Sequence, residues 1–191
     1  MGMPVTSARY WTVDDVWALP DDPQHRYEAV DGELLVSPSP RPIHQRAVRE
    51  LLAALDAYAR HAGIGEALAA PSDVVIPPGH LVQPDVYVIR PLGADELRAV
   101  DARTLPLPFL AVEVLSPGST RADRVITRRL YQRSGIECWI VDLDARLVEW
   151  WQADADRPEI VTGVLVWHPS GASAPLRVDV AGLMAAVHGD S

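Results

Sequence analysis

Two acidic residues stand beside apolar runs, where a carboxylate is costly to keep. Asp85 directly precedes the run 86–89, and Glu113 follows a run that begins at Phe109. One such acid alone would suit an exposed edge or a salt bridge, but a pair favours a functional site, because unpaired buried carboxylates are expensive. If the two strands are neighbours, both acids can converge on one ion. Magnesium prefers oxygen ligands, and it would polarise a phosphodiester and lower the pKa of a bound water.

The bulk composition excludes several classes of protein. The chain has 191 residues, a formal net charge of −9 and 48% hydrophobic residues, which fits one domain over residues 1–191. A chain this acidic is no general nucleic-acid coat, although a local basic face can still bind a polyanion. We find no membrane-spanning run and no signal-peptide core, so we expect a cytoplasmic protein. The single cysteine, Cys138, excludes an intrachain disulfide and is expected as a buried strand thiol.

Turn and helix signals outline the first elements. Asp31-Gly32 separates the runs 26–30 and 33–36 and predicts a β-hairpin, because such a turn needs positive φ. Apolar residues at helical spacing predict a helix over residues 43–62, with Gly63 at its C′ position. A short N-capped helix is expected over residues 12–17.

The remaining elements indicate a mixed fold. Strands are expected at residues 73–76, 81–89, 109–115, 137–141, 147–151, 160–167 and 176–178, and helices at 93–100, 120–133 and 180–187. This order predicts an α/β (mixed α+β) fold, in which a mixed central sheet is flanked by helices and carries added β-hairpins. Trp150 and Trp151 would place one ring on each face of a strand, so we expect one ring to be exposed or at an interface. A homodimer is expected.

An ordered set of short motifs resembles one known family. Each motif is weak alone, their order is specific, and together they cover about Tyr10 to Trp151. The motifs are Arg26-Tyr27-Glu28, Asp31-Gly32-Glu33-Leu34, Pro38, His44, Gln83-Pro84-Asp85-Val86, Glu113-Val114-Leu115-Ser116-Pro117, Tyr131, Gly135-Ile136 and Trp139-Ile140-Val141-Asp142. The chain closely resembles the Uma-type putative restriction endonuclease domain family, within the PD-(D/E)XK restriction-endonuclease-like superfamily.

The resemblance implies a fold and a metal site. The fold is a restriction-endonuclease-like core, about residues 26–151, in which helices flank a mixed four-stranded sheet and the site lies on the central strands. Asp85 and Glu113 would bind Mg²⁺ (or Mn²⁺), and the backbone carbonyl of Val114 would be a third ligand.

Three further side chains are candidates for accessory roles. The resemblance implies that Glu28 and His44 lie near the site. Helix capping or a surface imidazole explains His44 equally well. Asp73 could add a carboxylate, and a turn cap explains it as well.

The chain contains no lysine, since all 17 basic residues are arginine. In the superfamily's simplest pattern a lysine stands two residues after the second acid, where this chain has Leu115. The resemblance implies that the lysine has moved to the following helix. The matching positions are Asp123, Thr127 and Tyr131, which four-residue steps place on one helical ridge. Thr127 therefore fills the lysine position without a positive charge.

Arg124 is the candidate replacement for the lost charge. It lies three residues before Thr127 and shares its helical face. Arginine supplies charge but stays protonated, so it cannot act as a general base. The segment's arginines could form a solvated face or a basic strip that holds phosphates, and both interpretations stay open. They are Arg121, Arg124, Arg128, Arg129 and Arg133.

Three functions follow from these residues. The first is a magnesium-dependent endonuclease that cuts nucleic-acid phosphodiesters, with DNA as the expected partner and with Asp85, Glu113 and Arg124 in catalytic positions. The second is a catalytically weakened relative that binds nucleic acid or protein, which Thr127 motivates. The third is an α/β domain with an unrelated partner.

Overall fold

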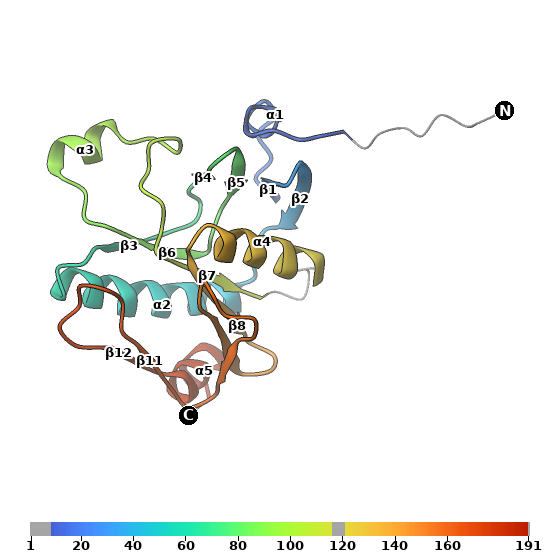
Figure 1. Ribbon diagram of the computed structural model, residues 1–191. Helices are drawn as coiled ribbons and strands as arrows, with labels where there is room; N and C mark the ends of the chain where they lie inside the picture. Colours follow the sequence, from blue (N-terminus) through green and yellow to red (C-terminus); the bar gives the residue numbers. More distant parts are fainter. Residues whose placement is uncertain (1–8, 116–120, 191) are drawn as a thin grey trace.

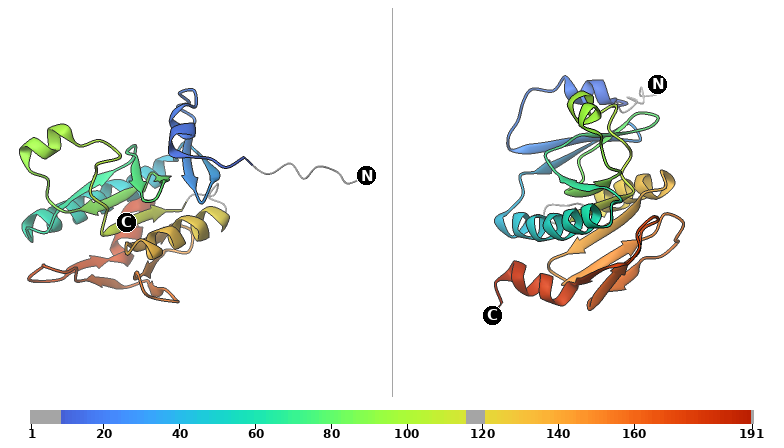
Figure 2. Two further views of the ribbon diagram at one scale, coloured as in Figure 1. Left: turned by 45° about the horizontal axis from the view of Figure 1, so that its top comes forward. Right: turned by 90° about the vertical axis from the view of Figure 1, so that its left-hand side faces the viewer.

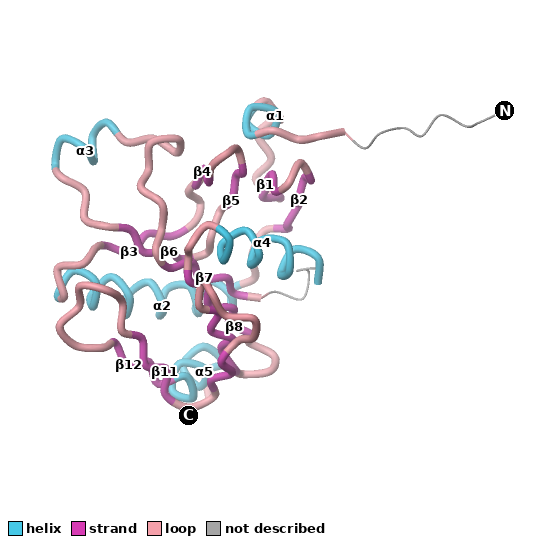
Figure 3. Tube along the Cα trace, viewed as in Figure 1, coloured by secondary structure: helices cyan, strands magenta, loops and turns pink. Residues whose placement is uncertain are grey.

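The structure is a computed structural model, and it describes residues 9–115 and 121–190, without the side chains of residues 121–124. Figure 1 labels the helices and strands, and Figure 3 distinguishes them from the loops. In chain order they are α1 (Val13–Trp17), β1 (His25–Val30), β2 (Glu33–Pro38), α2 (Pro42–His61), β3 (Glu66–Ala69), β4 (Val74–Ile76), β5 (His80–Val82), β6 (Val86–Ile89), α3 (Ala94–Ala99), β7 (Leu110–Val114), α4 (Arg121–Arg133), β8 (Glu137–Asp142), β9 (Leu147–Trp151), β10 (Glu159–Val161), β11 (Val164–Trp167), β12 (Leu176–Asp179) and α5 (Val180–His188).

The strands form three sheets. The largest has the order β10-β9-β8-β7-β6-β3, and β7 and β8 run parallel within it while the other neighbours are antiparallel. A second sheet has the order β2-β1-β5-β4, and β11 pairs with β12. The expected mixed sheet flanked by helices is confirmed. It has six strands rather than four, because β9 and β10 extend it beyond β8.

The central strands are buried on both faces. Val86 and Val88 of β6 belong to one apolar cluster, which also contains residues of α2, α5 and β11. Tyr87 and Ile89 belong to a second cluster, which contains residues of α4 and of the four-stranded sheet. Successive side chains of a strand point to opposite faces, so α2 and α4 cover opposite sides of β6 to β8 (Figure 2). The acids at these strands therefore lie inside the fold.

Two turn signals act as the sequence predicts. Asp31 and Gly32 have φ values of 52° and 80°, and they join β1 to its antiparallel partner β2. Helix α2 begins at Pro42 and ends at His61, and Gly63 follows with a φ of 66°. Both the hairpin and the helix are confirmed.

Two of the expected strands are each divided in the structure. The stretch 81–89 contains β5 and β6, which belong to different sheets. Pro84 lies between them and has no N–H to donate to a ladder, so the strand cannot continue through it. The stretch 160–167 likewise spans β10 and β11, which belong to different sheets.

The tryptophan pair differs from expectation in one respect. Trp150 and Trp151 pack against opposite clusters, as predicted. Both rings are partly buried, and Trp150 donates its Nε1 hydrogen to Glu137 while Trp151 donates its own to Glu149. Neither ring is exposed, and the other half of the expectation, a ring at an interface, stays a prediction. Cys138 is a buried strand thiol, as predicted. None of the described helices combines the length and apolar character that crossing a bilayer requires.

Candidate functional site

Strand pairing brings the two acids together. Strands β6 and β7 are antiparallel, and Val86 lies opposite Val112. One step further along this register places Asp85 opposite Glu113. Their convergence required neighbouring strands, and β6 and β7 are neighbours.

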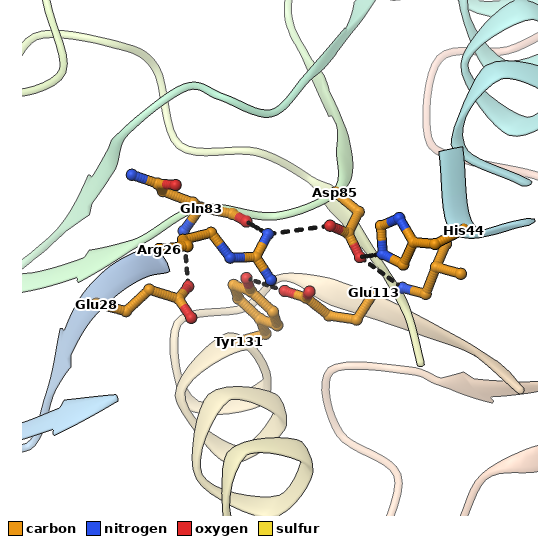
Figure 4. Close-up of polar contacts among 8 residues, drawn as sticks. Arg26, Glu28, His44, Gln83, Asp85, Glu113 and Tyr131 are labelled. Atoms are coloured by element: carbon orange, nitrogen blue, oxygen red, sulfur yellow. Dashed lines mark hydrogen bonds and ion pairs between the residues drawn. The ribbon is translucent and has the colours of Figure 1, made fainter. Parts of the chain in front are cut away.

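Asp85 is buried and surrounded by donors. Its side chain accepts hydrogen bonds at Oδ1 from Arg26 Nη1 at 3.0 Å, and at Oδ2 from His44 Nε2 at 3.0 Å and Val114 N at 2.8 Å (Figure 4). Burial alone would raise the pKa of Asp85, but the hydrogen bond from His44, the charge of Arg26 and the Val114 N–H together lower it below its usual value. Asp85 is therefore a carboxylate anion.

Glu113 has the opposite electrostatic environment. Its Oε1 accepts a hydrogen bond from the Tyr131 hydroxyl at 2.7 Å. Burial, followed by the charges of Asp85 and Glu28, raises the pKa of Glu113 well above its usual value. The two acids cannot both ionise easily unless a further positive charge enters the site.

Arg26 of β1 supplies one cation at this position. Its Nη1 donates to the backbone oxygen of Gln83 at 2.8 Å as well as to Asp85. Burial would lower the pKa of Arg26, but the charges of Glu28, Asp85 and Glu113 raise it above its ordinary value. Figure 4 shows the guanidinium between Glu28 and Asp85. The site therefore contains three carboxylates around one arginine.

From the sequence we expected this charge at Arg124, whose side chain lies outside the described residues. Arg26 was part of a motif, without an assigned role. A signal was present, because Arg26 and Glu28 are two residues apart on a strand and so share a face. Because Glu28 was a candidate site residue, Arg26 should have been considered as one too.

His44 supports Asp85 from the first turn of α2. Its side chain is only 7% exposed, which excludes the surface-imidazole interpretation. The N-cap of α2 is Arg41, and no side chain caps this end of the helix. His44 Nδ1 is buried and has no hydrogen-bond partner among the residues that the structure describes, whereas Nε2 donates to Asp85 Oδ2 at 3.0 Å.

Glu28 and Asp73 hold the segment before Asp85 from two sides. Glu28 accepts from the Gln83 backbone N–H at 2.7 Å. Asp73 accepts from the Gln83 side-chain amide at 2.6 Å and from Trp17 Nε1 at 2.7 Å. Asp73 is thus connected to the acid pair only indirectly, by way of Gln83. Its two described hydrogen bonds come from side chains, so they do not support the turn-cap interpretation.

Helix α4 places Thr127 and Tyr131, two residues of the predicted helical ridge, close to Glu113. Thr127 and Tyr131 are both buried, and Tyr131 contacts Glu113 directly. Thr127 lines the same small cavity as Glu113. The position assigned to the family lysine therefore faces the acids. The Asp123 side chain lies outside the described residues.

Two cavities meet at the site. A pocket of ≈ 610 Å³ is lined by Asp85 and His44, and a cavity of ≈ 40 Å³ is lined by Glu113 and Thr127. Arg26 lines both. The Arg26 guanidinium thus lies between the cavity beside Asp85 and the cavity beside Glu113.

The donor set fits a divalent cation that keeps most of its waters. Among the described residues, no three His, Cys, Asp or Glu side chains form a metal-binding group. Asp85 and Glu113 are two neighbouring carboxylates, and the Val114 carbonyl is adjacent in sequence. Magnesium is commonly held by one or two carboxylates plus waters. Burial, followed by the charges of Asp85 and Glu28, raises the pKa of Glu113, and a bound cation would offset this cost of ionising it.

Comparisons with known proteins identify a family and a shared fold. The model of the Uma2 family, described as "Putative restriction endonuclease", matches residues 13–179. A crystal structure of a protein from Anabaena variabilis ATCC 29413, described as a putative nuclease belonging to DUF820, is similar with a TM-score of 0.75 and 21% sequence identity. The similarity covers 93% of this chain and 99% of that chain, and it shows a shared fold. None of the curated proteins matches the chain.

Proposed function

Because the chain belongs to the Uma2 family of putative restriction endonucleases, we propose that it is a metal-dependent endonuclease that hydrolyses nucleic-acid phosphodiester bonds, with DNA as the expected substrate. The observation that supports this most is the neighbouring pair Asp85 and Glu113 with the Arg26 guanidinium beside it. Paired carboxylates with a cation are suited to a reaction in which negative charge builds up on a phosphate.

Mg²⁺ or Mn²⁺ would be held by Asp85, Glu113 and the Val114 carbonyl. When bound, the ion would polarise the phosphodiester and lower the pKa of a coordinated water. The N–H of Val114 and the imidazole of His44 fix the Asp85 carboxylate in place.

Arg26 is the residue that we assign to phosphate binding. Its described hydrogen bonds all leave from Nη1, so Nη2 and Nε keep donors for a phosphate oxygen. Its side chain is 25% exposed, and it lines both cavities. Arginine suits phosphate because its planar fork binds two oxygens and its charge does not titrate away.

Thr127 supports an alternative function, a catalytically weakened module that binds nucleic acid or protein. Thr127 lines the cavity beside Glu113 but brings no charge. Both oxygens of Asp85 already accept hydrogen bonds from the protein. These hydrogen bonds would stabilise the fold even in a protein that no longer cleaves nucleic acid.

A cleavage assay separates the two functions. Labelled DNA and RNA oligonucleotides are incubated with Mg²⁺ or Mn²⁺ and the wild type, Asp85→Asn, Thr127→Lys or the surface control Asp95→Asn. We expect cleavage by the wild type and Asp95→Asn, and loss of at least a hundredfold in Asp85→Asn. An inactive wild type together with an active Thr127→Lys would support the weakened module instead. The expected homodimer stays a prediction, and sedimentation velocity tests it.

A further inference from the structure

The ≈ 610 Å³ pocket beside Asp85 has the size of a small-molecule site. Ligand pockets generally enclose about 300–1,000 Å³. Its wall comes from segments far apart in the chain: the end of α1 and the loop after it, the start of β1, the connection from β2 to α2, and the first turns of α2. Asp85, His44 and Arg26 form one side, so any occupant lies next to the proposed reaction centre.

The charge of the pocket disfavours a phosphate backbone inside it. Asp21, Asp22 and Asp73 line the wall, and the formal net charge of the chain is −9. Asp22 and Asp73 have hydrogen-bond partners, whereas Asp21 is exposed and makes no side-chain hydrogen bond among the described residues. Carboxylates repel phosphates but accept hydrogen bonds from the amino groups of bases. A phosphate would lie at Arg26, and an uncharged group would enter the pocket.

The apolar side of the pocket has a fixed aromatic ring. Trp17 is 40% exposed, and its Nε1 donates to Asp73 at 2.7 Å. The Arg103 guanidinium lies 4.5 Å from the centre of the ring. Prolines fill much of the remaining wall: Pro20, Pro23, Pro38, Pro40 and Pro71. Aromatic rings bind nucleobases of any sequence by stacking.

Gln45 adds a polar group with no other described task. It lies on the first turn of α2, is exposed, and lines the pocket. Its side chain makes no hydrogen bond among the described residues. A side-chain amide both donates and accepts, so it can pair with the edge of a base.

We propose that this pocket receives one unpaired nucleotide of the substrate strand, with its base against Trp17 and its phosphate at Arg26, so that the protein acts on single-stranded nucleic acid. The base of a duplex is stacked and paired, and it reaches such a pocket only after leaving the helix. This inference rests on the proposed function, since it places the phosphate at the same acid pair.

A binding assay tests the pocket independently of cleavage. Fluorescence anisotropy in EDTA compares three labelled probes of equal length: a single-stranded DNA, its blunt duplex, and a single strand with abasic sites. The proteins are the wild type, Trp17→Ala, Gln45→Ala and Gln24→Ala. Gln24 is an exposed glutamine that does not line the pocket, so it is the matched control. Thermal unfolding checks that each variant folds.

We expect the wild type to bind the single strand more tightly than either other probe. Trp17→Ala should weaken that binding roughly 5- to 150-fold, as loss of base stacking does, and Gln45→Ala should weaken it several-fold, with Gln24→Ala unchanged. If Trp17→Ala does not fold, Gln45→Ala decides. Preference for the duplex, equal binding of the abasic strand, or unchanged binding in the folded pocket variants would overturn the inference, while cleavage of the oligonucleotides in the earlier assay would still support the proposed function.

Discussion

Arg26 links the four-stranded sheet to the acid pair, so its replacement should destabilise the protein in a pH-dependent way. Arg26→Met keeps most of the side-chain length and removes the charge. Two hydrogen bonds from a charged donor are lost, to Asp85 at 3.0 Å and to the Gln83 carbonyl at 2.8 Å. Such bonds contribute about 1.5–3 kcal/mol each, and breaking a buried ion pair costs about 3–5 kcal/mol. Because Arg26 is 25% exposed, we expect a loss of about 3 kcal/mol at pH 7.

The sign of the pH dependence follows from the two acids. The pKa of Asp85 is lowered on folding, so Asp85 contributes stability that is present above its unfolded pKa and lost as the pH falls through the folded value. The pKa of Glu113 is raised, and Arg26 is among the charges that limit this rise. Without Arg26 both acids are less stable as anions. The unfolded pKa of Asp85 is 3.8 and the folded value is lower, so the deficit of Arg26→Met should be larger at pH 7 than at pH 3.

Urea denaturation at pH 7 and pH 3 measures this effect. Arg26→Lys restores a positive charge without the planar fork, and it should recover part of the loss at pH 7. Arg98→Met is the control, because Arg98 pairs with Asp95 on the surface and should contribute almost nothing. A loss below 1 kcal/mol, or an equal loss at both pH values, would refute the assigned role of Arg26.

Two further substitutions test the packing around the site. Tyr131→Phe removes the hydroxyl that donates to Glu113 at 2.7 Å, and denaturation should show a loss of about 1–2 kcal/mol, whereas no loss would mean that this contact is not formed. Gly65→Ala places a Cβ at 2.0 Å from the Ile89 carbonyl oxygen, so it should destabilise by at least about 1–3 kcal/mol. Gly79→Ala meets no atom within 4 Å and is the control; equal effects at both glycines would contradict the described backbone contact.

Local signals predicted much of the fold. The Asp31-Gly32 turn needs positive φ, which predicts the hairpin. The apolar residues of 43–62 recur at helical spacing, which predicts a helix. The convergence of Asp85 and Glu113 was predicted only on the condition that their strands are neighbours, and the pairing of β6 with β7 meets that condition. Such features depend on short stretches of chain or on one strand pairing.

The cation of the site was not predictable in the same way. Arg124 was chosen because helical spacing places it near Thr127, which is reasoning within one element. Arg26 instead reaches Asp85 from another sheet, and the two residues are 59 positions apart. Which sheet approaches the acid pair is decided by tertiary packing. The division of residues 81–89 differs, because Pro84 is a local signal: it has no N–H for a ladder, and β5 lies in that second sheet.

We propose that Asp85 and Glu113 together form a divalent-metal site. Isothermal titration of Mn²⁺ into the wild type, Asp85→Asn, Glu113→Gln and Asp95→Asn tests it most directly. Asp95 is the control, because it is a surface carboxylate that pairs with Arg98. We expect the wild type and Asp95→Asn to bind Mn²⁺ alike, and each pair variant to lose at least tenfold in affinity, about 1.4 kcal/mol. Absence of binding to the wild type, or equal losses in all three variants, would contradict it.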